Sequence, residues 1–173
     1  MDKKEFALFC SALRTFYPKE NLLPNEQSME LWYIQLQDIP YKTAVLILNK
    51  WVATNKWSPS ISDIREQAVG IMEKDKDWGE AWADVLKAIQ KFGYVSEKEA
   101  MASLDELTQR AVRRLGFRNL CWSEDIQIDR ANFRMIYETE QKRAKEEAQL
   151  PPRLKELIKG IGKNDNMDKS LPG

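Results

Sequence analysis

The apolar residues of this chain recur at intervals of three and four positions, the spacing that places side chains on one face of an α-helix. In the first part of the chain this pattern predicts helices at about residues 3–17, 26–38, 41–55 and 60–72. In the second part it predicts helices at about residues 77–93, 96–102, 104–116 and 126–148. A weaker repeat predicts one more at residues 152–162. The chain is therefore expected to be all-α.

Cap residues mark the expected ends of these helices. N-terminal caps are expected at Asn25, at Ser60 with Asp63, at Ser96 with Glu99, and at Ser103. Gly93 and Gly116 fall where a helix would end. The chain has only seven glycines and seven prolines, which favours helices with short connections over a turn-rich β-fold.

A charge run at residues 73–77 divides the helical pattern into two parts and is the expected linker. Pro151 and Pro152 then break the last long helix. We expect two small helical bundles followed by a flexible C-terminal tail with a short amphipathic motif. The predicted domains are residues 1–75, 76–149 and 150–173.

Composition limits the chemistry that the chain can perform. The 173 residues suit one domain or two small ones, and 27 basic side chains balance 27 acidic ones, so no overall field attracts nucleic acid. The chain has no histidine, which excludes Ser–His and Cys–His pairs and imidazole zinc sites. Cys10 and Cys121 are too few for a four-thiolate site. We expect no catalytic site, no cofactor and no metal, and therefore no enzyme.

Two further features concern location and nucleotide binding. No stretch approaches the roughly 18 apolar residues of a membrane span, so no membrane contact is expected and the protein is predicted to be cytoplasmic. The segment "GIGK" at residues 160–163 resembles part of a phosphate-binding loop. Leu157 and Asn164 stand where that loop requires glycine and serine or threonine, so ATP binding is not expected.

The segment "WVATNKWSPSISDIREQA", residues 51–68, joins two predicted helices by a tight turn, as in a helix-turn-helix DNA reader. Arg65 and Gln67 are its candidate base-reading side chains. This helix and the charge run after it carry acids that phosphates would repel, namely Asp63, Glu66, Glu73 and Asp75. We therefore interpret the segment as a packing corner. Trp57 in the turn either closes this corner over the core, which we favour, or anchors a protein partner.

A group of basic residues follows in the second unit, at Arg110, Arg113, Arg114 and Arg118. The first three project to one side of a helix, and Phe117 and Trp122 are interleaved. This patch could bind phosphates, with an affinity that falls steeply as salt rises. It could also anchor a protein partner, or lie on a solvated helix face and pair with Glu124, Asp125 and the later glutamates of the same chain. We rank structural pairing first, protein binding second and nucleic-acid binding third.

The predicted tail helix carries an apolar side made of Leu154, Leu157, Ile158 and Ile161. Two prolines detach this helix from the preceding one, and it is too short to hold a core of its own. It could dock into a groove of a partner protein, or it could pack back on its own domain. Both interpretations stay open at this stage.

Several segments carry a family resemblance. The first unit contains the helix "FALFCSALRTFYP" and the block "MELWYIQLQDIPYKTAVLILNKWVATNKWSPSISDIREQA", with a turn built from Trp, Ser, Pro and Ile. These segments resemble the phage replicative-helicase loader/inhibitor family of Gram-positive hosts. The segments "DWGEAWADVLKAIQKFG", "LGFRNLCWSED" and "RANFRMIYE" are similar to the C-terminal extension of related phage replication proteins. The resemblance covers about residues 1–150.

The resemblance implies a small helical adaptor for phage DNA replication. Members of this family bind the hexameric replicative helicase, hold it inactive, and pass it to the phage origin through the origin-binding initiator. The matching motifs are packing signatures, so the resemblance assigns no partner-binding residue. The alternative is a replication or regulatory protein that binds nucleic acid through the patch from Arg110 to Arg118.

Overall fold

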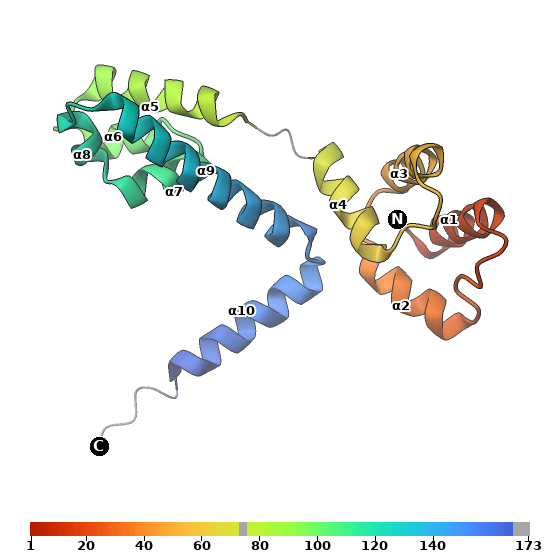
Figure 1. Ribbon diagram of the computed structural model, residues 1–173. Coiled ribbons are helices and arrows are strands. Elements are labelled where there is room, and N and C mark those ends of the chain that lie inside the picture. Colours follow the sequence, from red (N-terminus) through yellow and green to blue (C-terminus); the bar gives the residue numbers. More distant parts are fainter. Residues whose placement is uncertain (73–75, 168–173) are drawn as a thin grey trace. The chain divides into compact units, whose positions relative to one another are not determined.

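The computed structural model describes residues 1–72 and 76–167, and every secondary-structure element within them is an α-helix (Figure 1). The all-α prediction is therefore confirmed. The helices of the first part are α1 (Lys3–Phe16), α2 (Glu26–Leu36), α3 (Tyr41–Thr54) and α4 (Ile61–Met72). Those of the second part are α5 (Trp78–Phe92), α6 (Glu97–Ala102), α7 (Glu106–Leu115), α8 (Phe117–Trp122) and α9 (Ile126–Gln149). The last helix is α10 (Pro152–Met167).

The internal contacts of the chain define two compact units. Unit 1 comprises Met1–Lys74 together with Glu147–Gly173, and unit 2 comprises Asp75–Glu146. The end of the chain is thus grouped with unit 1. The predicted division into domains at residues 1–75, 76–149 and 150–173 stays a prediction. Part of the predicted linker, residues 73–75, and the last part of the predicted tail, residues 168–173, lie outside the described residues.

The core of unit 1 lies between α1, α2, α3 and α4. Helix α3 packs against both α1 and α4, as expected for the most apolar helix of this bundle. The apolar positions of these four helices converge on one cluster, whose most deeply buried members are Phe9, Cys10, Leu13, Leu36, Ala44, Ile47, Leu48 and Ile64. The helical spacing of these residues along the chain is what brings them to the inner faces.

The core of unit 2 forms where α5, α7 and α9 face each other. The ring of Phe133 lies between Trp82, at a centroid distance of 5.1 Å, and Tyr137, at 5.5 Å. Val85 and Val112 are fully buried beside this aromatic group. Such tilted and stacked ring pairs add to the stabilisation that burial alone provides.

The caps show which local signals decided the helix ends. Asn25 caps α2 as predicted, and Ser60 and Asp63 form the predicted reciprocal box. Ser96 is the N-cap residue of α6 as predicted, but the predicted capping box with Glu99 is wrong, because the Ser96 side chain makes no cap hydrogen bond. The predicted cap at Ser103 is also wrong. Its hydroxyl donates to the carbonyl of Ala100 in α6, and Asp105 caps α7 instead, accepting from Thr108 N at 3.0 Å.

The two glycines end their helices as predicted. Gly93 follows α5 at a φ of +60°, and Gly116 follows α7 at a φ of +85°. Residues with side chains rarely adopt this left-handed region, so glycine is the residue suited to both stops. Helix α8, which starts directly after Gly116, was not predicted, because six residues are too few to show a helical period and no cap residue marks its start. The equally short α6 was predicted from Ser96 and Glu99 at its start.

Candidate partner-binding surfaces

Arg65 is a central residue of the corner between α3 and α4. We expected its side chain to be exposed on a packing corner, and the expected exposure is wrong, because the residue is only 7% exposed. Its guanidinium binds the carboxylate of Asp38 with both ends, at 2.8 and 2.9 Å. It also donates to the backbone carbonyls of Gln35, at 2.6 Å, and Gln149. Because the guanidinium donates to these acceptors inside unit 1, it has no free pair of N–H groups with which to read the edge of a DNA base.

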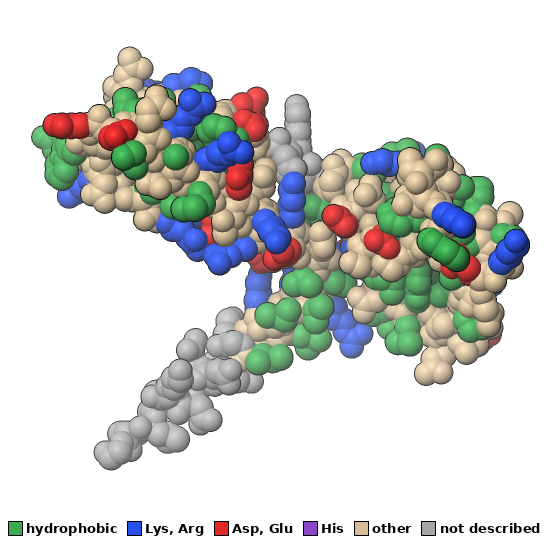
Figure 2. Space-filling model, viewed as in Figure 1, with side chains coloured by type: hydrophobic (Ala, Val, Ile, Leu, Met, Phe, Trp, Pro, Cys, Tyr) green, Lys and Arg blue, Asp and Glu red, His purple; other side chains and the backbone are tan. Residues whose placement is uncertain are grey.

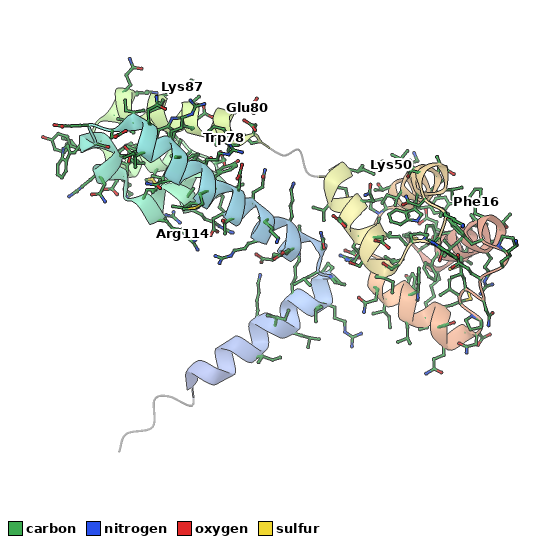
Figure 3. All side chains as sticks on the ribbon, viewed as in Figure 1. Phe16, Lys50, Trp78, Glu80, Lys87 and Arg114 are labelled. Atoms are coloured by element: carbon green, nitrogen blue, oxygen red, sulfur yellow. The ribbon has the colours of Figure 1, made fainter. Side chains whose placement is uncertain are left out.

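Gln67, the other base-reading candidate, is also engaged within unit 1. The ammonium of Lys50 on α3, labelled in Figure 3, donates to the Gln67 side-chain oxygen at 3.1 Å. This bond joins α3 and α4 across the corner. The segment therefore has the geometry of a packing corner rather than that of a helix presented to a DNA groove.

Trp57 does not close the corner, so our favoured prediction for this residue is wrong. Its side chain is 69% exposed, and Pro59 is buried in the corner instead. The backbone around Trp57 is nevertheless held firmly. Trp51 Nε1 donates to the Trp57 carbonyl at 2.9 Å, and the Ser58 hydroxyl donates to Glu20 at 2.6 Å. The fold thus presents the indole ring to solvent on a fixed loop.

The predicted apolar side of the tail helix exists on α10. Its members are exposed by 39% to 65%, and they are Leu154, Leu157, Ile158 and Ile161. Near the start of α10, Leu154 and Leu157 line a shallow groove with Ile34 of α2, while Pro151 is buried there. Figure 2 shows hydrophobic side chains gathered at this start of α10. The first turns of α10 therefore lie beside α2 within unit 1, and the apolar side of the helix remains largely exposed.

The arginine patch is an ion-paired surface of unit 2. The bonded pairs are Arg110 with Glu106 (2.6 Å), Arg113 with Gln109 (2.9 Å), Arg114 with Glu140 (2.8 Å) and Arg118 with Glu97 (3.1 Å). The prediction that a later glutamate would pair with this patch is confirmed by Glu140 of α9. The other two carboxylates come from α7 and α6, so Glu124 and Asp125 are not the partners in these pairs. Arg114, labelled in Figure 3, reaches the mostly buried Glu140, which Arg143 also contacts. These pairs reduce the positive charge that a phosphate backbone would meet.

Trp122 is an exposed residue that the sequence did not reveal as such. Its side chain is 64% exposed. Its ring lies 5.6 Å from that of Tyr94, which is also half exposed. The one available signal was the polar run Ser123–Glu124–Asp125 that follows it directly.

The two thiols are poor nucleophiles at neutral pH. Burial raises the pKa of Cys10 to about 11, although the charge of Arg14 opposes this shift. Burial also raises the pKa of Cys121, and the nearby charge of Glu97 acts in the same direction. Both groups are therefore protonated thiols, which react far more slowly than thiolates.

Within residues 1–72 and 76–167, the structure contains neither a metal-binding cluster nor a membrane-spanning helix. Among these residues, no group of three or more acidic or cysteine side chains is placed to hold a metal ion. Over the same ranges, no helix combines the length and apolar character needed to cross a membrane.

Comparison with known proteins gives one match. Residues 1–65 match the family model for the N-terminal domain of the helicase loader of phage SPP1. The matched part runs from α1 into α4 and includes the corner with Trp57 and Arg65. No curated protein and no solved structure matches the chain. The match supports a relationship between the first 65 residues of this chain and the phage helicase-loader family.

Proposed function

We propose that this protein is a non-enzymatic adaptor of phage DNA replication that binds the hexameric replicative helicase in the host cytoplasm. It either inhibits the helicase or delivers it to the origin, in the second case through the origin-binding initiator. The observation that carries this proposal is the match of residues 1–65 to the N-terminal domain of a phage helicase loader. The low reactivity of both thiols agrees with a role in binding rather than catalysis.

The exposed side of α10 is our first candidate for the helicase contact. Its four apolar residues are spaced so that they form one stripe along the helix: Leu154, Leu157, Ile158 and Ile161. A helix with such a stripe can dock into a hydrophobic groove of a partner. Ile158 is 51% exposed and Ile161 is 65% exposed, so both side chains are open to a partner.

Trp57 is our second candidate contact. Tryptophan is enriched among the residues that dominate protein interfaces. The bonds from Trp51 and Ser58 fix the loop, so little conformational freedom would be lost on binding. The ammonium of Lys56 lies 5.5 Å from the centre of the indole ring and adds a positive charge beside it. A partner pocket for Trp57 should therefore be apolar with an acidic edge.

The proposal is tested by mixing the full chain with the host replicative helicase and measuring the mass of the complex. A double variant, Ile158→Ser with Ile161→Ser, removes apolar groups from the exposed side of α10. Lys159→Ser is the matched control, because it places the same residue on the same helix but removes no apolar group. We expect the wild type and the control to bind and the double variant to bind at least tenfold more weakly. No complex with the wild type would refute the adaptor role.

The nature of the effect follows from two further measurements with the same proteins. Inhibition predicts that the helicase hydrolyses ATP more slowly when the adaptor is bound. Delivery predicts that more helicase is found on single-stranded DNA after the initiator is added. The arginine patch offers little support for the alternative, direct nucleic-acid binding, because all four arginines are bonded to side chains of unit 2.

A further inference from the structure

Unit 2 exposes an aromatic pair that its core does not use. The rings of Tyr94 and Trp122 lie 5.6 Å apart and are tilted by 49°. Tyr94 is 51% exposed and Trp122 is 64% exposed. Tyr94 follows α5 and Trp122 ends α8, so two distant parts of the chain meet here. Large aromatic side chains that stay open to solvent are typical anchors of protein interfaces.

Two exposed aliphatic residues are close to this pair along the chain. Val95, next to Tyr94, is 77% exposed, and Ile126, which starts α9 just after Trp122, is 55% exposed. We call Tyr94, Val95, Trp122 and Ile126 the aromatic end of unit 2. Figure 2 shows hydrophobic side chains at the end of unit 2 where α8 lies. Together they leave roughly 400 Å² of apolar surface open, within the range of the largest, often functional, patch of a monomer.

The aromatic end is held in place before any contact. Arg118 Nε on α8 donates to Glu97 of α6 at 3.1 Å and joins the two sides of the patch. Beyond Trp122, the Asp125 carboxylate accepts from Ile128 N at 3.1 Å and fixes the start of α9. A rigid patch loses little freedom on association, which favours binding.

Charged residues of both signs lie within four positions of the aromatic end along the chain. Lys98 and Arg118 carry positive charge, and Glu97, Glu124 and Asp125 carry negative charge. A nucleic acid would bring its phosphates towards these acids. A partner of one uniform charge would likewise meet repulsion on part of the rim. A surface with the same mixture can instead place acids opposite bases.

We propose that the aromatic end is the contact surface between two copies of this chain. In a two-fold contact each copy offers the same patch, so a mixed rim can pair with itself. Two such patches would remove roughly 800 Å² of apolar surface, and the rim would bring the total towards the ~1,200 Å² at the lower end of specific interfaces. The dimer is therefore weak and forms as the concentration rises. This dimer contact does not depend on the proposed helicase contact, so either proposal can be wrong while the other holds.

Sedimentation equilibrium of the full chain over a wide concentration range tests this proposal. The wild type should rise from the monomer mass of 20.2 kDa towards twice that value. Trp122→Ser and Val95→Asp should each weaken the dimer at least tenfold. Met135→Ser, on the 63% exposed Met135 of α9, is the matched control and should dimerise like the wild type. Circular dichroism should show the same helix content in all four proteins.

Three results would overturn the proposal. The wild type could keep the monomer mass at every concentration. The dimer could persist in both Trp122→Ser and Val95→Asp. Alternatively, a monomeric wild type could bind helicase or single-stranded DNA in a way that both variants lose, which would assign the aromatic end to another occupant.

Discussion

The guanidinium of Arg65 and the carboxylate of Asp38 form a two-pronged ion pair at 2.8 and 2.9 Å, with Arg65 almost fully buried. The same guanidinium donates to the carbonyl of Gln149, at the end of α9. One side chain therefore fastens the start of the C-terminal segment to α2 and α4. Because α10 begins just after this point, Arg65 positions the base of the helix that we propose as a helicase contact.

Arg65→Lys should destabilise unit 1 and loosen the base of α10. Lysine keeps the charge but cannot reproduce the forked geometry, so we expect a loss of about 1–3 kcal/mol in the free energy of unfolding. Urea unfolding measures this loss, and hydrogen exchange at residues 150–160 should become faster. Arg113→Lys, at an exposed arginine, is the control and should change little. Unaltered stability and exchange in Arg65→Lys would contradict the role of Arg65 as a fastening point.

Substitution of Trp51 should lower the stability of the fold, whereas substitution of Trp57 should lower helicase binding. Trp51→Phe removes the indole donor that binds the Trp57 carbonyl at 2.9 Å and should cost about 1 kcal/mol of unfolding free energy. Trp57→Ser removes an exposed ring and should change that free energy by no more than about 0.5 kcal/mol, while weakening helicase binding. Thermal unfolding and the helicase mass assay separate the two effects. A large loss of stability in Trp57→Ser would mean that its ring packs in solution.

Phe133 should be the most sensitive position of the unit 2 core. It is fully buried between the rings of Trp82 and Tyr137. Phe133→Ala should cost about 3–5 kcal/mol, because it removes burial and leaves a cavity. Met135→Ala lies on the same helix but at an exposed position, so it should be near neutral. Equal melting temperatures of the two variants would show that this core is not packed as described.

Unit 2 should become less stable in acid as the carboxylate of Asp84 is protonated. A hydrogen bond from Lys76 Nζ at 2.7 Å, followed by one from Lys87, lowers the pKa of its carboxyl below the ordinary value. Because the folded pKa lies below the unfolded one, the stabilisation is present above about pH 4 and is lost as the pH falls through the folded pKa. Solvent screens this exposed pair, so the effect is small and shrinks with salt.

Asp84→Asn measures this contribution. The variant should lose less stability than the wild type when urea unfolding is followed from about pH 5 downwards. Its stability should also depend less on salt near neutral pH. Parallel pH profiles of the two proteins would show that the ion pair with Lys76 contributes nothing.

Local sequence signals predicted those parts of the fold that local physics decides. The spacing of Trp82 and Val85 predicted α5, and the side chain of Asn25 predicted the start of α2. Arg65 was misread because its acceptors, Asp38 and the Gln149 carbonyl, lie far away in sequence and no local pattern shows them. An arginine next to acids on an amphipathic helix is normally a solvated residue.

The candidate binding surfaces also differ in whether local sequence predicts them. The apolar stripe of α10 could be read from spacing alone, since it depends only on the helix that carries it. The exposure of Trp57 and Trp122 could not be predicted from the sequence, because a tryptophan side chain is buried only if a neighbouring element covers it. In the corner between α3 and α4, Pro59 is the buried residue, and the ring of Trp57 is exposed to solvent.

The central claim is that this chain binds a replicative helicase, and the mass of the mixture tests it most directly. Light scattering coupled to gel filtration should show the full chain travelling with the host helicase hexamer. The complex should survive Lys159→Ser and be lost or strongly weakened when Ile158→Ser is combined with Ile161→Ser. A helicase peak of unchanged mass in the presence of the wild-type chain would contradict the account.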